Sequence, residues 1–164
     1  LKMRRDDLNG AMQDYQNALT IYRNIDSKLG EANTFKSLGD LKMRRDDLDE
    51  AMQDYQNALT IYRNIDSKLD EADTLKAFGD LKMRRDDLNG AMQDYQNALT
   101  IYRNIDEKMG EADTLKAFGD LKMRHDDLDG AMQDYQNALT IYRDIDGKMG
   151  EAKTLKAIEE LNKK

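Results

Sequence analysis

The sequence of 164 residues contains no cysteine, no proline and no tryptophan, and only one histidine. Without cysteine the chain has no disulfides and no thiolate metal ligands, which is compatible with a reducing compartment; a cytoplasmic location is expected. No apolar run approaches the length that crosses a membrane, and no basic stretch followed by an apolar one marks a signal peptide. We therefore expect no membrane partner.

Positive charge is also in short supply. Lysine and arginine number 26 against 33 aspartates and glutamates, which gives a net charge of −7. A chain of this charge repels a phosphate backbone at long range, so nucleic acid is not an expected partner. Good helix formers are abundant, and 39% of residues are hydrophobic against 36% charged, enough for a core if helices segregate the two kinds onto faces. The expected fold class is all-α.

The chain repeats itself every 40 residues. The segment LKMRRDDL begins at Leu1 and recurs at each period, with one change, His125 in place of arginine, in the last copy. The segment AMQDYQNALTIYR begins at Ala11 and recurs three times without change. We expect a single tandem-repeat array over residues 1–164, with the four periods 1–40, 41–80, 81–120 and 121–164.

Apolar spacing divides each period into two amphipathic helices. In the first helix apolar residues recur every three positions from Ala72 to Leu81, and in the second they follow the i, i+3, i+4, i+7 rule from Met92 to Ile105. We interpret both stripes, including Tyr95 and Tyr102, as core. The expected helices are 11–25, 30–45, 51–65, 70–85, 91–105, 110–125, 131–145 and 150–162, with residues 1–5 as the end of a further helix.

These residues resemble the tetratricopeptide repeat family over about thirty positions of each period. Phe78-Gly79 is similar to the family's Leu-Gly step, and Ala91, Tyr95 and Ala98 match its small, aromatic and small residues. Two features depart from the family. Its usual repeat is about 34 residues and closes with proline, and Lys82 stands where an aromatic is usual.

The longer period, in which Gly110-Glu111-Ala112 opens a first helix, is similar to the extended repeats of spindle-orientation adaptor and G-protein-modulator proteins. The family resemblance implies a right-handed superhelical solenoid of antiparallel helix pairs, with the first helices lining its concave side. Gly79 would let the two helices of a pair approach closely. The function implied is a scaffold that binds a peptide or protein segment along this concave side.

The resemblance also places a row of first-helix residues on the concave face. The row consists of Asn33, Lys36, Asp40, Met43, Arg44, Asp73, Lys76, Asp80, Met83, Arg84, Asp113, Lys116, Asp120, Met123 and Arg124. We expect the Met83 series to lie among charges as an exposed contact. Aspartate stands in this row where peptide-binding relatives commonly have asparagine, which disfavours a strongly acidic ligand and favours one of mixed charge.

The charges of this row also have an internal explanation. Asp73 with Lys76, Lys76 with Asp80, and Asp80 with Arg84 have the spacing of helical ion pairs, each worth about 0.2–0.5 kcal/mol. A solvated, self-paired ladder is therefore one interpretation. The other is that a mixed-charge peptide exchanges for these weak pairs. The cations that it would meet are Lys36, Lys76, Lys116, Arg44, Arg84 and Arg124.

No catalytic, cofactor or metal site is expected. A nucleophile or general base needs a partner, and the chain offers one histidine, His125, at a position held by arginine in the other copies. The acidic turns fail as EF-hand loops: with Gly130 at the sixth place, Gln136 occupies the twelfth, where a glutamate is required. We expect no enzyme, no cofactor and no bound metal.

Two functions remain open. The first is the binding scaffold, and the alternative is a structural or engineered repeat array, or spacer, with no dedicated ligand. At the C-terminus, Ile158-Glu159-Glu160 replaces the Phe-Gly-Asp step of the array. Because glycine is needed only where another helix crosses closely, residues 151–164 are expected to form a capping helix.

Overall fold

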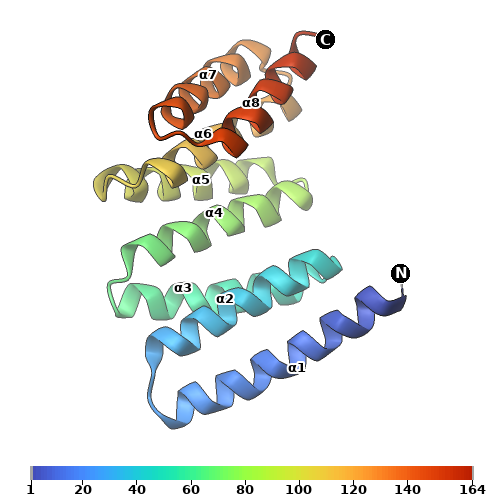
Figure 1. Ribbon diagram of the computed structural model, residues 1–164, viewed down its shortest axis with the longest axis vertical. Helices are drawn as coiled ribbons and strands as arrows, with labels where there is room; N and C mark the ends of the chain where they lie inside the picture. The colour runs from blue at the N-terminus through green and yellow to red at the C-terminus, as the bar shows by residue number, and fades with distance from the viewer. Residues whose placement is uncertain (1, 164) are drawn as a thin grey trace.

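A computed structural model describes residues 2–163 of the chain (Figure 1). Within this range the chain forms eight helices and no strand, which confirms the all-α class. Their bounds are α1 Lys2–Asn24, α2 Lys28–Arg45, α3 Leu48–Asn64, α4 Lys68–Arg84, α5 Leu88–Asn104, α6 Lys108–Arg124, α7 Leu128–Asp144 and α8 Lys148–Leu161.

The helices stack in chain order into an elongated solenoid, with α1 at one end and α8 at the other (Figure 1). The most extensive contacts join α2 to α3, α4 to α5 and α6 to α7. These are antiparallel pairs, as the sequence predicts. We call α2, α4, α6 and α8 the first helices and α1, α3, α5 and α7 the second helices. Successive first helices also touch one another, so they form one continuous layer.

The core consists of one apolar cluster for each junction between pairs. In the second period Leu75 and Phe78 of α4 pack against Tyr55 and Leu59 of α3 and against Tyr102 of α5. The rings of Tyr55 and Phe78 lie 5.7 Å apart in a tilted arrangement. α4 is therefore held between the second helices α3 and α5, so that adjacent repeats stabilise one another.

The predicted core stripe of the second helix is confirmed in its middle and wrong at its ends. Tyr95, Leu99 and Tyr102 are buried, whereas Met92 and Ile105 are 39% and 38% exposed. Met92 is the fifth residue of α5 and Ile105 follows its last residue, whereas Ala91 beside Met92 is fully buried. Burial near the helix ends therefore does not follow the apolar spacing alone.

Glycines mark the places where the two helices of a pair touch. A Cβ atom added to Gly79 would lie 2.3 Å from Cε1 of Tyr95 in α5, and Gly39 and Gly119 meet Tyr55 and Tyr135 in the same way. No real Cβ atom tolerates such a distance. The close approach implied by the family resemblance is present, and in each case a tyrosine ring lies against the glycine.

An aspartate in the left-handed region forms each of the seven turns between the described helices. Its φ angle lies between 51° and 68°. Aspartate tolerates this conformation better than most residues because its short side chain bonds locally, but only glycine adopts it without cost. The turns therefore carry a small, repeated conformational strain.

Asp126 gives a test of this strain, since its φ is 62°. We expect Asp126→Gly to be more stable than Asp126→Ala by about 1 kcal/mol, because a Cβ atom is disfavoured at positive φ. The order should reverse at Gln93, an exposed position inside α5, where alanine is the better helix former. Urea unfolding of the four variants measures both differences, and equal stability of the two Asp126 variants would contradict the account.

Most helices begin two or three residues earlier than the sequence analysis predicts. The polar segment Asp86–Gly90 has the composition of a turn, but its last three residues already belong to α5. The helix begins there because the side chain of Asp87 accepts a hydrogen bond from the backbone N–H of Gly90 at 2.9 Å. Asp127 caps α7 in the same way. An N-cap satisfies a backbone donor that would otherwise lack a partner, so it extends the helix toward the turn.

The N-terminal prediction is wrong. Residues 1–5 were expected to end one helix, with a turn before Ala11, but α1 runs without interruption from Lys2 to Asn24; residue 1 lies outside the described range. Elsewhere the reversal at the equivalent residues is stabilised by contact between the two helices that it joins. Among the described residues, α2 is the only helix with extensive contacts to α1, so no partner helix stabilises a reversal before Ala11 and α1 continues.

Candidate functional site

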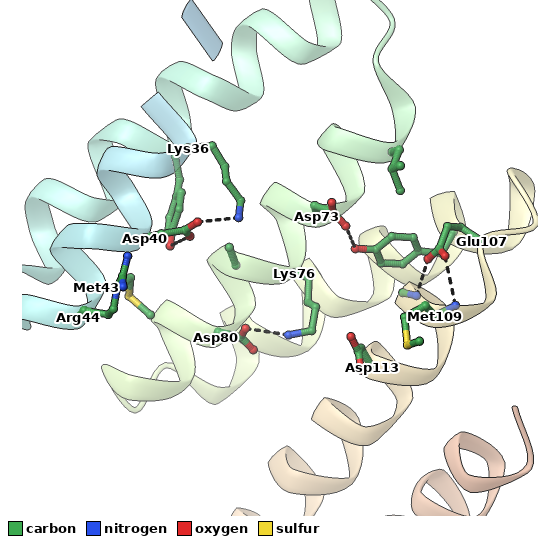
Figure 2. Close-up of a pocket in the computed structure, with 15 residues that line it drawn as sticks. Lys36, Asp40, Met43, Arg44, Asp73, Lys76, Asp80, Glu107, Met109 and Asp113 are labelled. Atoms are coloured by element: carbon green, nitrogen blue, oxygen red, sulfur yellow. Dashed lines mark hydrogen bonds and ion pairs between the residues drawn. The ribbon is translucent and has the colours of Figure 1, made fainter. Parts of the chain in front are cut away.

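The first helices line a groove made of two adjoining cavities. The central cavity, of about 750 Å³, lies over α2, α4 and α6, and the second, of about 560 Å³, lies over α4, α6 and α8. The two share four lining residues, Lys76, Asp80, Met109 and Asp113, so they form one continuous groove. Figure 2 shows charged side chains from successive first helices lining its central part. This is the concave side implied by the resemblance.

A ladder of lysine–aspartate pairs follows the groove, with one pair in each of α2, α4 and α6. Lys36 lies 2.7 Å from Asp40, Lys76 lies 2.8 Å from Asp80, and Lys116 repeats the contact with Asp120 at 2.7 Å. These are the i, i+4 pairs predicted from the spacing. Because their side chains are partly open to solvent, each pair is worth only a fraction of a kcal/mol.

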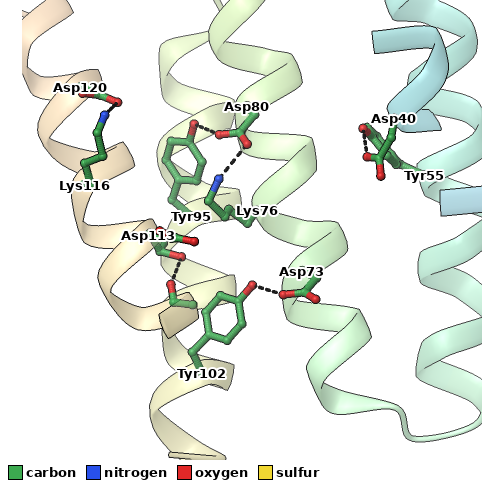
Figure 3. A network of polar contacts seen from close by, with 12 residues as sticks. Asp40, Tyr55, Asp73, Lys76, Asp80, Tyr95, Tyr102, Asp113, Lys116 and Asp120 are labelled. Atoms are coloured by element: carbon green, nitrogen blue, oxygen red, sulfur yellow. Dashed lines mark hydrogen bonds and ion pairs between the residues drawn. The ribbon is translucent and has the colours of Figure 1, made fainter. Parts of the chain in front are cut away.

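The other oxygen of each ladder aspartate accepts a hydrogen bond from a buried tyrosine. Tyr95 in α5 donates a hydrogen bond from its hydroxyl to Asp80 at 2.8 Å, and Tyr55 does the same to Asp40 (Figure 3). Tyr135 repeats the bond with Asp120. Burial first, and then the neighbouring carboxylate, raise the pKa of Tyr95 well above its ordinary value. The phenol therefore stays a hydrogen-bond donor at any working pH, and each aspartate is held from two sides.

A second set of tyrosines holds a second row of groove residues. Tyr62 donates to Asn33 at 2.7 Å, and in the next two copies Tyr102 and Tyr142 donate to Asp73 and Asp113. Neither set of tyrosine hydrogen bonds was predicted from the sequence. The signal was present, since a buried tyrosine hydroxyl usually finds a partner, but the partners lie on other helices.

Two of the three arginines in the predicted row, Arg84 and Arg124, do not line the groove. Arg84 reaches back to the preceding repeat, where it donates to the carbonyl of Met43 and to Asp46 Oδ1 at 2.6 Å. Arg124 makes the same contacts with Met83 and Asp86. The predicted pair of Asp80 with Arg84 is therefore wrong, because the guanidinium binds a carbonyl at the end of the preceding first helix together with the turn aspartate.

Two further expectations about this row need correction. Asp73 accepts its hydrogen bond from Tyr102 and does not pair with Lys76, whose partner is Asp80. Met43, Met83 and Met123 are half-buried and pack against the core clusters, so they do not form an exposed row. More exposed apolar side chains line the groove near the start of the first helices, where Leu69 and Met109 are 46% and 44% exposed.

The groove thus contains most of the predicted site residues. Those that line it are Lys36, Asp40, Met43, Arg44, Asp73, Lys76, Asp80, Asp113, Lys116 and Asp120. Asn33 lines a smaller hollow beside Lys36 and Asp73. The remaining four, Met83, Arg84, Met123 and Arg124, hold adjacent repeats together or pack on the core.

Outside the groove, an ion pair links the two helices of each pair. Lys82, which stands where the family usually has an aromatic, lies 2.7 Å from Asp94 in α5, and Lys42 and Lys122 have equivalent partners in Asp54 and Asp134. Burial raises the pKa of Asp94 above its ordinary value, and the Lys82 ammonium offsets only part of this effect. A charged pair has replaced aromatic packing at this position.

The repeats also match a known protein family. A family model described as soluble NSF attachment protein, SNAP, matches residues 2–105, which is more than half of the chain. The chain belongs to the SNAP family. No match was found among curated protein sequences.

Solved structures place the SNAP-family chain among TPR-like solenoids. BtubC (BKLC) from P. vanneervenii matches with a TM-score of 0.79 and 18% identity, over 99% of this chain and 70% of BtubC. The apo form of RapI matches with a TM-score of 0.84 and 16% identity, over 98% of this chain but only 45% of RapI. The N-terminal domain of stress-induced protein-1 (STI-1) from C. elegans gives 0.64 and 17%, over 83% of this chain and 98% of that domain. These TM-scores establish the TPR-like fold, which typically mediates protein–protein interactions.

This SNAP-family chain has few residues of the kinds that commonly act in catalysis or bind metal ions. His125 is exposed at the end of α6. Within residues 2–163, no group of three or more histidine, aspartate or glutamate side chains is arranged to hold a metal ion. None of the helices in the described range is long and apolar enough to cross a membrane.

Proposed function

We propose that this chain is a non-enzymatic interaction scaffold that binds a segment of another protein in the groove of its first helices. The observation that carries the proposal is the continuity of the groove, which extends over four successive first helices. A peptide in a groove of this kind is contacted by several repeats at once, so weak contacts add up. The name of the family, an attachment protein, supports a binding role.

The proposed ligand is a mixed-charge segment, and the proposed setting is the cytoplasm. Lys36, Lys76 and Lys116 alternate along the groove with the acidic residues Asp40, Asp80 and Asp120. Each lysine is held only by a partly exposed i, i+4 pair, so exchange for a ligand carboxylate costs little. The absence of cysteine supports a reducing compartment.

A spacer without a dedicated ligand is the second candidate. The self-paired ladder and the tyrosine–aspartate bonds favour it, because the groove charges already have partners within the array. The two candidates differ in whether anything binds the groove. The 40-residue period and the Gly110-Glu111-Ala112 opening further support kinship with the extended repeats of spindle-orientation adaptors, which we retain as part of the proposal.

Selection from a random peptide library displayed on phage, with the whole array as bait, tests the scaffold directly. We expect a selected peptide to bind the wild-type array and to lose about tenfold or more in affinity in Lys76→Glu, since the reversal turns an attractive groove contact into a repulsive one. Lys163→Glu at the far end of the chain makes the same charge change outside the groove and should bind as the wild type does. If no library peptide is enriched, or if both variants bind equally well, the spacer is the better account.

A further inference from the structure

An unpartnered apolar row lies along one side of the groove. It consists of Leu69, Met109 and Met149, the second residues of α4, α6 and α8, which are 46%, 44% and 73% exposed. Leu69 and Met109 line the central cavity, and Met109 and Met149 line the next one. Apolar side chains gathered in a concave surface mark a place where another molecule removes them from water.

The carboxylates beside this row have only neutral partners. Asp73 and Asp113 accept from the hydroxyls of Tyr102 and Tyr142, and Glu107 accepts from backbone N–H groups at the start of α6. Among the described side chains, residues 8–163, none of these three carboxylates forms an ion pair with lysine or arginine. Figure 2 shows Glu107, Met109 and Asp113 close together at one end of the central cavity.

The lysines that line the central cavity form their ion pairs with other carboxylates and not with Asp73, Asp113 or Glu107. Lys36 and Lys76 lie against Asp40 and Asp80, and Figure 3 shows Lys76 turned toward Asp80 and Asp73 turned toward Tyr102. The surrounding groove wall desolvates Asp73 and raises its pKa, and the hydrogen bond from Tyr102 and the charge of Lys36 oppose this only in part. An incoming cation would stabilise the ionised form and lower that pKa again.

We infer that the groove selects a segment that presents lysine or arginine to Asp73 and Asp113 and apolar side chains to Leu69 and Met109. The inference rests on the proposed function and names the chemistry of its ligand. Adjacent helices lie roughly 10 Å apart and an extended peptide advances about 3.4 Å per residue, so the basic residues should recur about every third position. Charge complementarity gives such a ligand its preference over an acidic one.

Two synthetic peptides serve as probes, one with four repeats of Lys-Leu-Ser and one with four repeats of Glu-Leu-Ser. The test variant is Asp73→Asn with Asp113→Asn, which removes two charges and keeps the hydrogen bonds, since Asn33 accepts from Tyr62 at 2.7 Å at the equivalent position. The matched control is Asp129→Asn with Asp144→Asn in α7, where other copies carry Asn89 and Asn104. Both variants are therefore expected to fold.

We expect the lysine peptide to bind the wild-type array at least about tenfold more tightly than the glutamate peptide, with an affinity that falls as salt rises. The Asp73/Asp113 variant should lose most of this preference, and the control should keep it. Tighter binding of the glutamate peptide, no binding of either, or a preference that survives the Asp73/Asp113 substitutions would overturn the inference. These results do not decide the proposed function, because that is tested separately by the binding of the library-selected peptide to the wild-type array and to Lys76→Glu.

Discussion

Gly79→Ala should destabilise the array by about 2–3 kcal/mol, although alanine is the better helix former by about 1 kcal/mol. The new methyl group would lie 2.3 Å from the ring of Tyr95. That ring is fixed in place, because its hydroxyl donates to Asp80 and the ring makes an edge-type contact with Phe118, with 5.7 Å between ring centroids. The helices of the pair would have to separate, which exposes core.

Gly10→Ala is the matched control, because Gly10 also lies inside a helix but nothing lies within 4 Å of its added Cβ atom. It should stabilise the protein by roughly 0.5–1 kcal/mol. Chemical denaturation of both variants and the wild type measures the two effects, which have opposite signs. A Gly79→Ala protein as stable as the wild type would mean that the close approach of α4 and α5 is not needed.

Gly79 is a sharper choice than Gly110, which also faces a tyrosine at 2.3 Å. At the position equivalent to Gly110 the second copy carries Asp70, so the array already accommodates a side chain there. The positions equivalent to Gly79 are glycine in every first helix that is followed by a second helix, and α8 carries Glu159 instead. The capping role of residues 151–164 agrees with this pattern and remains a prediction.

Asp94→Ala should cost about 2–3 kcal/mol. It leaves the Lys82 ammonium, 2.7 Å away in the wild type, without its partner at the junction of α4 and α5. The expected cost is below the roughly 3–5 kcal/mol of a fully buried pair because the Lys82 side chain is 25% exposed. Replacing both residues, as Lys82→Met with Asp94→Leu, should restore stability to within about 1 kcal/mol of the wild type, since no lone charge remains. A double variant less stable than Asp94→Ala would contradict this.

Lys82→Met alone should make stability depend on pH in a defined direction. Burial raises the pKa of Asp94, and removing the ammonium that opposes the shift raises it further. A carboxyl with a raised pKa binds more protons in the folded than in the unfolded state. The variant should therefore gain stability relative to the wild type as the pH falls from about 7 to about 5. Thermal melts at the two pH values check the sign.

Much of the fold could be predicted because its determinants are local. The period, the pairing of helices and the buried positions of Leu75, Phe78 and Tyr95 follow from apolar spacing within some twenty residues. Local rules also led to errors. The i, i+4 rule found Lys76 with Asp80 but assigned Arg84 wrongly, because its acceptors Met43 and Asp46 lie 41 and 38 residues earlier in the chain.

The candidate site was predictable in position but not in chemistry. The resemblance placed Asp73 and Lys76 on the concave face, and both line the groove. The two residues differ in their hydrogen-bond partners. Asp73 accepts from Tyr102, which is 29 residues away in the sequence, whereas Lys76 donates to Asp80 in its own helix. The apolar row of Leu69 and Met109 was missed because these residues fall outside the core stripe, where a sequence pattern gives no reason to separate a contact from a chance surface residue.

The most direct test of the groove as a binding site is photo-crosslinking of a library-selected peptide to two versions of the array. One carries p-benzoylphenylalanine in place of Lys76 in the groove, and the other carries it in place of Gln96, which is exposed on the second helix α5. We predict a covalent adduct with the array labelled at position 76 and none at position 96. An adduct at position 96 and none at position 76 would contradict the account, because the ligand would then lie on the second helices.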